Sequence, residues 1–177
     1  MKVSKVDAAR RQLETAVTLY FHEGDPVSIH TLTCAAYEVL RRINKGTPMI
    51  KDWMKDYIKP EYVKKFGSKL NEAQNFFKHA DRDAEKTLTF EPRTTHILLL
   101  DACWAYKRIA QERLPLLAIF EMWAATTWGK HYITVPGLDL SDPEVVKWAS
   151  LSRQEFFNTF VPVAYAATVA LPAGGSP

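Results

Sequence analysis

The sequence predicts an all-α protein, a single-domain bundle of about six or seven helices, and three observations support this. Hydrophobic residues recur at spacings of three and four along most of the chain, which is the period of an amphipathic helix. Proline directly follows aspartate, threonine or lysine at several points, a pattern typical of helix starts. No long segment alternates hydrophobic and polar residues, so no convincing strand is expected.

The N-terminal half divides into four helices at its capping signals. Ser4 and Asp7 resemble a capping box ahead of the first helix, and Gly24 is expected to end it. Asp25 then caps the second helix, with proline at its first position. The predicted helices are about 5–22, 26–45, 48–58 and 60–80.

The C-terminal half starts from a charged segment, 81–93, which is predicted to be a loop with a short extended piece at Thr87–Phe90. Pro162 is expected to break or kink the last helix. The predicted helices are about 93–113, 115–128 and 142–160. Together the helices make one domain over 1–170, followed by a flexible tail over 171–177.

Composition and charge are those of a globular chain. The 177 residues are 47% hydrophobic and 12% aromatic, which suits a single domain with a buried core. Lys and Arg number 23 and Asp and Glu 20, a net charge of +3 that neither demands nor excludes a polyanionic partner. The N-terminus lacks an apolar signal core and no stretch reaches about 18 apolar residues. We therefore expect a cytoplasmic protein with no membrane partner.

The two cysteines, Cys34 and Cys103, each lie in an apolar helical stretch and form no CxxC pair. We expect two buried free thiols, no metal site and no cofactor. The helices that carry them are expected to pack near the centre of the bundle. Asp81 and Asp83 alternate as in a calcium loop, but the required glycine and closing glutamate are missing.

The stretch NEAQNFFKHADRDAE, residues 71–85, contains the principal candidate for chemistry. If the helix continues to residue 80, Asn75 and His79 share one face and Lys78 lies beside them. In a catalytic interpretation His79 is the acid-base group, Lys78 contacts a phosphate and Asn75 orients the ring or the ligand. In a structural interpretation His79 is a charge at a helix C-terminus, stabilised by the helix dipole. Ligand binding without chemistry is a third possibility.

Two other helices contain candidate ligand-binding residues. His30 lies on a half-apolar helix face, where an interior histidine with hydrogen-bond partners is the structural alternative. Asp101 interrupts the apolar run ILLLDACWAY, so it lies at an edge or has a partner. A histidine of another helix, His30 or His79, is the more specific candidate for that partner. Trp104 follows Asp101 on the same helix and is a candidate lining residue, together with Trp123 and Trp128.

The predicted helix 48–58 carries a row of lysines that includes Lys51 and Lys55, interleaved with aromatic residues. Basic rows with stacking side chains suit single-stranded RNA or DNA. They equally suit a solvated helix face over a packed aromatic one.

Three segments, DPVSIHTLTCAAYEVL, NEAQNFFKHADRD and LLLDACWAYKRI, resemble a family of uncharacterised bacterial helical proteins over most of residues 5–125. The end of the predicted helix 60–80 more distantly resembles HEPN-like domains, many of which are metal-independent ribonucleases of toxin or defence systems. That resemblance implies roles for Asn75 and His79. The arginine of the HEPN motif is absent here, because residue 74 is glutamine and Arg82 follows the histidine.

These observations leave three hypotheses for function. The first is a small helical protein with a binding or regulatory role, working as a homodimer. The second is a HEPN-like endoribonuclease that uses the helix end at 75–79. The third is binding of a small ligand in an aromatic-lined pocket between helices.

Overall fold

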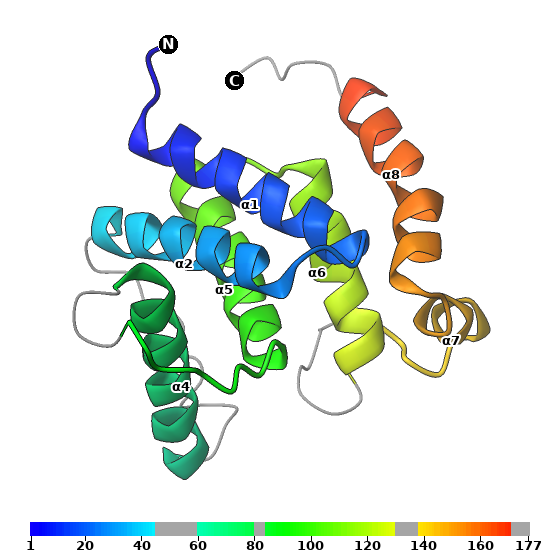
Figure 1. Ribbon diagram of the computed structural model, residues 1–177. Coiled ribbons are helices and arrows are strands. Elements are labelled where there is room, and N and C mark those ends of the chain that lie inside the picture. The colour runs from blue at the N-terminus through cyan, green and yellow to red at the C-terminus, as the bar shows by residue number, and fades with distance from the viewer. Residues whose placement is uncertain (45–59, 80–83, 130–137, 171–177) are drawn as a thin grey trace.

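The computed structural model describes residues 1–44, 60–79, 84–129 and 138–170, and these residues form an all-α protein of seven helices (Figure 1). Within these ranges no strand is present, and Thr87–Phe90 has no regular structure. The predicted helix 48–58 and the predicted tail lie outside the described residues. The helix bounds are α1 Lys5–Phe21, α2 Pro26–Ile43, α4 Pro60–Lys78, α5 Arg93–Ala110, α6 Pro115–Trp128, α7 Pro143–Ala149 and α8 Arg153–Ala170.

Three helix starts form as their capping residues predict. The Ser4 hydroxyl accepts a hydrogen bond from the Asp7 backbone N–H at 3.0 Å at the start of α1. Asp25 and Asp142 accept equivalent bonds ahead of α2 and α7, at 2.7 and 2.8 Å, and each is followed by proline. These local bonds supply acceptors for backbone N–H groups that have no partner inside the helix.

Two helix ends differ from the prediction. Glu23, and not Gly24, adopts the left-handed backbone conformation that ends α1, with φ of 53°. Gly24 packs closely on α1, because a Cβ atom there would lie 2.9 Å from Cδ2 of Leu19 and that side chain would have to shift. Helix α5 stops at Ala110, three residues before the predicted end, because Gln111 is left-handed with φ of 53°.

The prediction of one helix over 142–160 is wrong, because the chain breaks at Ser150–Ser152 into α7 and α8. Ser152 and Glu155 form a capping box: the Ser152 N–H donates to Glu155 Oε2 at 2.8 Å, and the Glu155 N–H donates to Ser152 Oγ at 3.3 Å. Helix α8 then continues past Pro162 to Ala170. Proline removes the bond to the carbonyl of Asn158, and both residues are exposed, so water can satisfy that carbonyl.

The helices pack around a core that α5 and α6 cross in antiparallel directions (Figure 1). Helices α1 and α2 form an antiparallel pair over them, α8 packs on α6, and α4 lies beside α2 and α5. The two cysteine-bearing helices, α2 and α5, contribute to this core as predicted and also contact each other, and both thiols are buried and free. The largest fully buried side chains include Leu13, Tyr20, Phe21, Leu40, Leu99, Leu100, Tyr106, Phe120 and Phe156.

Candidate functional site

The residues predicted to be catalytic lie at the exposed end of α4. Asn75, Lys78 and His79 are all exposed, and the His79 backbone N–H donates to the Asn75 carbonyl at 3.0 Å. The acidic residues predicted to follow, Asp81 and Asp83, lie outside the described residues. The three side chains are therefore accessible to a ligand from solvent, and their catalytic role stays a prediction.

The end of α4 also covers a buried polar cluster around His30. Its Nδ1 lies 2.8 Å from the Thr95 hydroxyl, and its Nε2 lies 3.3 Å from Cys34 Sγ. The rings of Phe77 and Phe90 meet the imidazole edge-on, with centroids 5.5 and 5.2 Å away. His30 is thus an interior histidine with a partner at each ring nitrogen, as the structural alternative predicted.

Burial keeps this cluster uncharged. It lowers the pKa of His30 to about 4, and the nearby Lys78 ammonium adds to the effect. Burial also raises the pKa of the Cys34 thiol to about 12, although Lys78 opposes the shift. A reactive cysteine needs a lowered thiol pKa. At neutral pH the Cys34 thiol and the His30 imidazole are both neutral, which is the protonation state of a packed interior.

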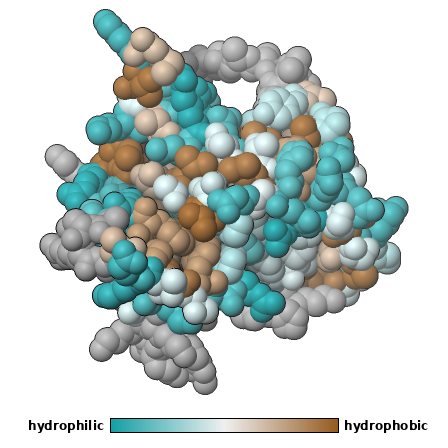
Figure 2. All heavy atoms as spheres, viewed as in Figure 1, coloured by the Kyte–Doolittle hydropathy of each residue, from teal (hydrophilic) through white to brown (hydrophobic). Residues whose placement is uncertain are grey.

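Hydrophobic residues reach the surface in the middle of the face shown in Figure 2, bordered by hydrophilic ones. Where α2 starts, Val27 is 39% exposed, and the covering rings of Phe77 and Phe90 are half-buried. The cover over His30 is therefore made of side chains that themselves contact solvent.

The remaining predicted ligand-binding residues are dispersed. Asp101 is fully buried in α5, and it does not pair with His30, whose ring nitrogens face Thr95 and Cys34. Trp104 is half-buried and packs against the core. Lys51 and Lys55 lie outside the described residues. The structure thus places His30 on α2 and both Asp101 and Trp104 on α5, two helices in contact, without joining the three residues in one site.

A second histidine, His96, lies where four helix ends meet, and it is not among the residues predicted from the sequence. Tyr20 lies in the last turn of α1 and His96 in the first turn of α5, while Trp128 is the last residue of α6 and Arg153 the first of α8; we call these four residues the His96 corner. The Arg153 guanidinium carbon lies 4.3 Å from the centroid of the Tyr20 ring. The His96 ring meets Tyr20 edge-on at 4.8 Å and lies parallel to Trp128 at 6.1 Å.

The His96 corner combines an imidazole with positive charge and aromatic rings. Burial lowers the pKa of His96 to about 4, and the guanidinium groups of Arg153 and Arg93 add to the effect. Tyr20 is held from behind by Trp123, whose indole N–H donates to the tyrosine oxygen at 3.0 Å. The four residues of the His96 corner are far apart in the sequence, so no local motif indicates that they meet. The hypothesis of an aromatic pocket had included Trp128.

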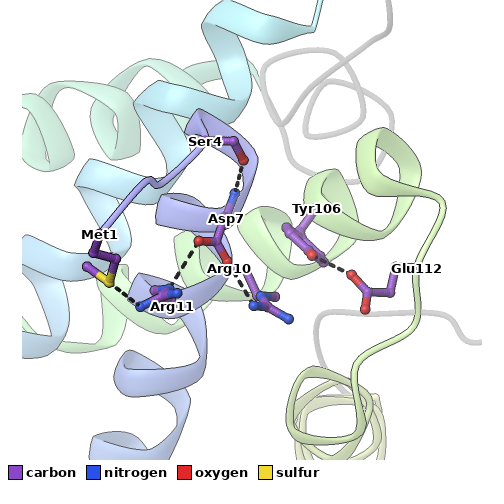
Figure 3. Close-up of polar contacts among 7 residues, drawn as sticks. All are labelled: Met1, Ser4, Asp7, Arg10, Arg11, Tyr106 and Glu112. Atoms are coloured by element: carbon purple, nitrogen blue, oxygen red, sulfur yellow. Dashed lines mark hydrogen bonds and ion pairs between the residues drawn. The ribbon is translucent and has the colours of Figure 1, made fainter.

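A third polar group, drawn in Figure 3, lies along the first turns of α1 and at the end of α5. Asp7 pairs with Arg10 at 2.8 Å and with Arg11 at 3.2 Å. The Tyr106 hydroxyl donates to Glu112 at 2.7 Å. These arginines are paired within their own helix and exposed to solvent, so they are surface ion pairs of small energetic value.

A cavity of about 210 Å³ lies between the end of α6 and α7. No lining residue is charged, and the lining consists of Thr126, Leu140, Val145, Val146, Ala149 and Ser150. This hollow has room for a few atoms of an apolar side chain or a few water molecules.

The outer side of α8 is hydrophobic and exposed. Its inner side chains Phe156 and Phe160 pack in the bundle, while Val163 is 63% and Tyr165 44% exposed. No charged residue occurs between Phe156 and Ala170. We call the exposed residues Pro162, Val163, Tyr165, Ala166 and Ala167 the α8 outer face.

Comparisons with protein-family models, with curated proteins and with solved structures find no match to this chain. Among the described residues, none of the helices is both long enough and apolar enough to span a membrane. The geometry of the chain itself is therefore the basis for a functional proposal.

Proposed function

We propose that this chain is a small helical binding protein of the cytoplasm that works as a homodimer, with the α8 outer face as its dimer interface. The observation that carries the proposal is the exposed, uncharged surface of α8, on which Val163 is 63% exposed. A hydrophobic surface open to water is unfavourable by roughly 25 cal/mol per Å² of apolar area, and a partner that covers it gains that free energy.

A second copy of the chain is the partner that this surface suits best. In a twofold dimer each residue of the interface meets the same surface on the other subunit, so charged faces juxtapose like charges. The α8 outer face has no charged residue, so two copies can approach there without repulsion although the chain as a whole carries +3. Antiparallel pairing of the two α8 helices would also oppose their dipoles favourably.

The buried histidine and cysteine side chains are neutral at neutral pH, which fits a binding protein better than an enzyme. His30, Cys34 and Cys103 are buried, and burial favours the neutral form of each. Two buried, free thiols also suit the reducing environment of the cytoplasm. These three buried groups therefore contribute to packing in this proposal.

The dimer is expected to be weak. A standard interface buries roughly 1,600 Å² in total, and one face of a single helix supplies less than that. We therefore expect the dimer to dissociate on dilution into the low micromolar range.

Sedimentation velocity over a series of protein concentrations tests the proposal. The wild-type chain should shift from monomer to dimer as concentration rises, and Val163→Asp should remain monomeric because an unpaired carboxylate would be buried at the interface. Val27→Asp is the matched control, because Val27 is also an exposed helical valine and lies on α2, away from α8. A wild-type chain that stays monomeric at high concentration, or a Val163→Asp variant that still dimerises, would refute the proposed interface.

A further inference from the structure

The His96 corner has an excess of positive charge from two helix starts. Arg93 is the first residue of α5 and Arg153 the first of α8, and the positive charges of both act on the His96 ring. A helix start favours negative charge, because its free N–H groups form the positive end of the dipole. The first turn of α5 has no acidic residue and begins with Arg93.

Among the residues the structure describes, neither guanidinium group forms an ion pair with a carboxylate within 4.0 Å. The two nearby acids have other partners: Glu91 accepts the Arg93 backbone N–H at 3.3 Å, and Glu155 accepts both the N–H and the hydroxyl of Ser152. The arginines of α1 and α2 differ, since Asp7 pairs with Arg10 and Arg11 and Glu38 with Arg41 and Arg42.

An aromatic ring holds one of these two cations in place. Arg153 is half-buried, with its guanidinium 4.3 Å from the centroid of the Tyr20 ring. Trp123 anchors that ring through the hydrogen bond to the tyrosine oxygen at 3.0 Å. A guanidinium fixed on an aromatic face keeps its planar N–H fork available for an oxyanion, and less conformational freedom is lost on binding.

The same corner offers planar side chains to a ligand. The half-buried rings of His96 and Trp128 lie within 4° of parallel, with centroids 6.1 Å apart. Aromatic faces of this kind stack on planar rings, which nucleobases also present. The exposed side chain of Arg93, three residues before His96 on the same helix face, completes the cationic side.

We infer that the His96 corner binds a small ligand that carries an oxyanion beside a planar ring, of the nucleoside monophosphate class. Arg153 and Arg93 bind the phosphate, and the planar ring lies against Trp128 and His96. This inference does not rest on the α8 dimer, because the corner is formed by a single chain.

Isothermal titration calorimetry with AMP, inorganic phosphate and adenosine tests the inference. AMP should bind the wild-type chain more tightly than phosphate or adenosine does, because it engages both the arginines and the rings. Each arginine that contacts the phosphate makes a charge-assisted hydrogen bond, so Arg93→Gln and Arg153→Gln should each weaken AMP binding by about tenfold or more. Raising the salt concentration should also weaken AMP binding in the wild type.

Arg113→Gln is the matched control, because Arg113 is an exposed arginine beyond the opposite end of α5 and its loss should leave AMP binding unchanged. Far-UV circular dichroism checks that each variant is folded. Arg93 has an exposed side chain, so its variant keeps the test valid even if Arg153→Gln unfolds. An absence of AMP binding in the wild type, an equal loss in Arg113→Gln, or adenosine binding as tight as that of AMP would overturn the inference.

Discussion

His30 and Thr95 are joined by a hydrogen bond of 2.8 Å between the imidazole Nδ1 and the threonine Oγ1, although 65 positions separate them. The bond connects α2 to the first turn of α5 inside the bundle, where both side chains are fully or almost fully buried. Cys34 lies 3.3 Å from the other ring nitrogen, so the imidazole has a partner on each side. The three side chains form a buried polar link between the two helices.

The first prediction concerns this link. Thr95→Val keeps the shape of the side chain but removes the hydroxyl, which leaves His30 Nδ1 without its partner. Such a change should lower the free energy of unfolding by about 1–3 kcal/mol. Thr31→Val is the control, since the Thr31 hydroxyl is exposed and bonds only to its own helix, and it should cost under about 0.5 kcal/mol. Urea unfolding measures both, and equal losses would show that the buried bond contributes nothing.

The second prediction is a loss of stability in mild acid. Burial lowers the pKa of His30 to about 4 in the folded protein, below the ordinary value of 6.5. Between these two values the unfolded chain takes up a proton that the folded chain does not, so stability falls as the pH falls through this window. His96, with a pKa lowered to about 4, acts in the same direction.

Urea unfolding of the wild type and of His30→Gln at several pH values between 7 and about 4.5 measures this effect. The variant should be less stable at neutral pH because the glutamine does not reproduce the ring's bonds. Its stability should nevertheless depend less steeply on pH, because only His96 of the two buried histidines is left to titrate. If wild type and variant showed the same pH slope, His30 would not be the group that titrates.

The third prediction concerns the exposed end of α4. If the HEPN-like interpretation holds, purified protein cleaves single-stranded RNA in the presence of EDTA and His79→Ala does not. If His79 is only a helix end, neither protein cleaves RNA, and this is the outcome we expect, because the arginine of the HEPN motif is absent. Gel analysis of a mixed RNA substrate distinguishes the two. Cleavage by the wild type that disappears in His79→Ala would contradict the binding-protein proposal.

Local signals predicted most of the helix starts. Ser4, Asp25 and Asp142 all cap the helices that follow them, because an N-cap needs only an acceptor side chain two or three residues from the N–H it serves. The capping box formed by Ser152 and Glu155 was present in the sequence as well, and recognising it would have separated α7 from α8. The helix ends were harder to predict, since Glu23 and Gln111 adopt the left-handed backbone conformation although neither is glycine.

The sequence by itself determined the all-α class, the central position of the two cysteine-bearing helices and the burial of both thiols. Helical periodicity and caps depend on neighbours within a few positions, so they can be read along the chain. Only the tertiary structure decided that His30 faces Thr95 and not Asp101, and that Tyr20, His96, Trp128 and Arg153 meet at one corner. Such contacts depend on how helix faces are rotated and crossed against one another, and the packing of the whole core sets those angles.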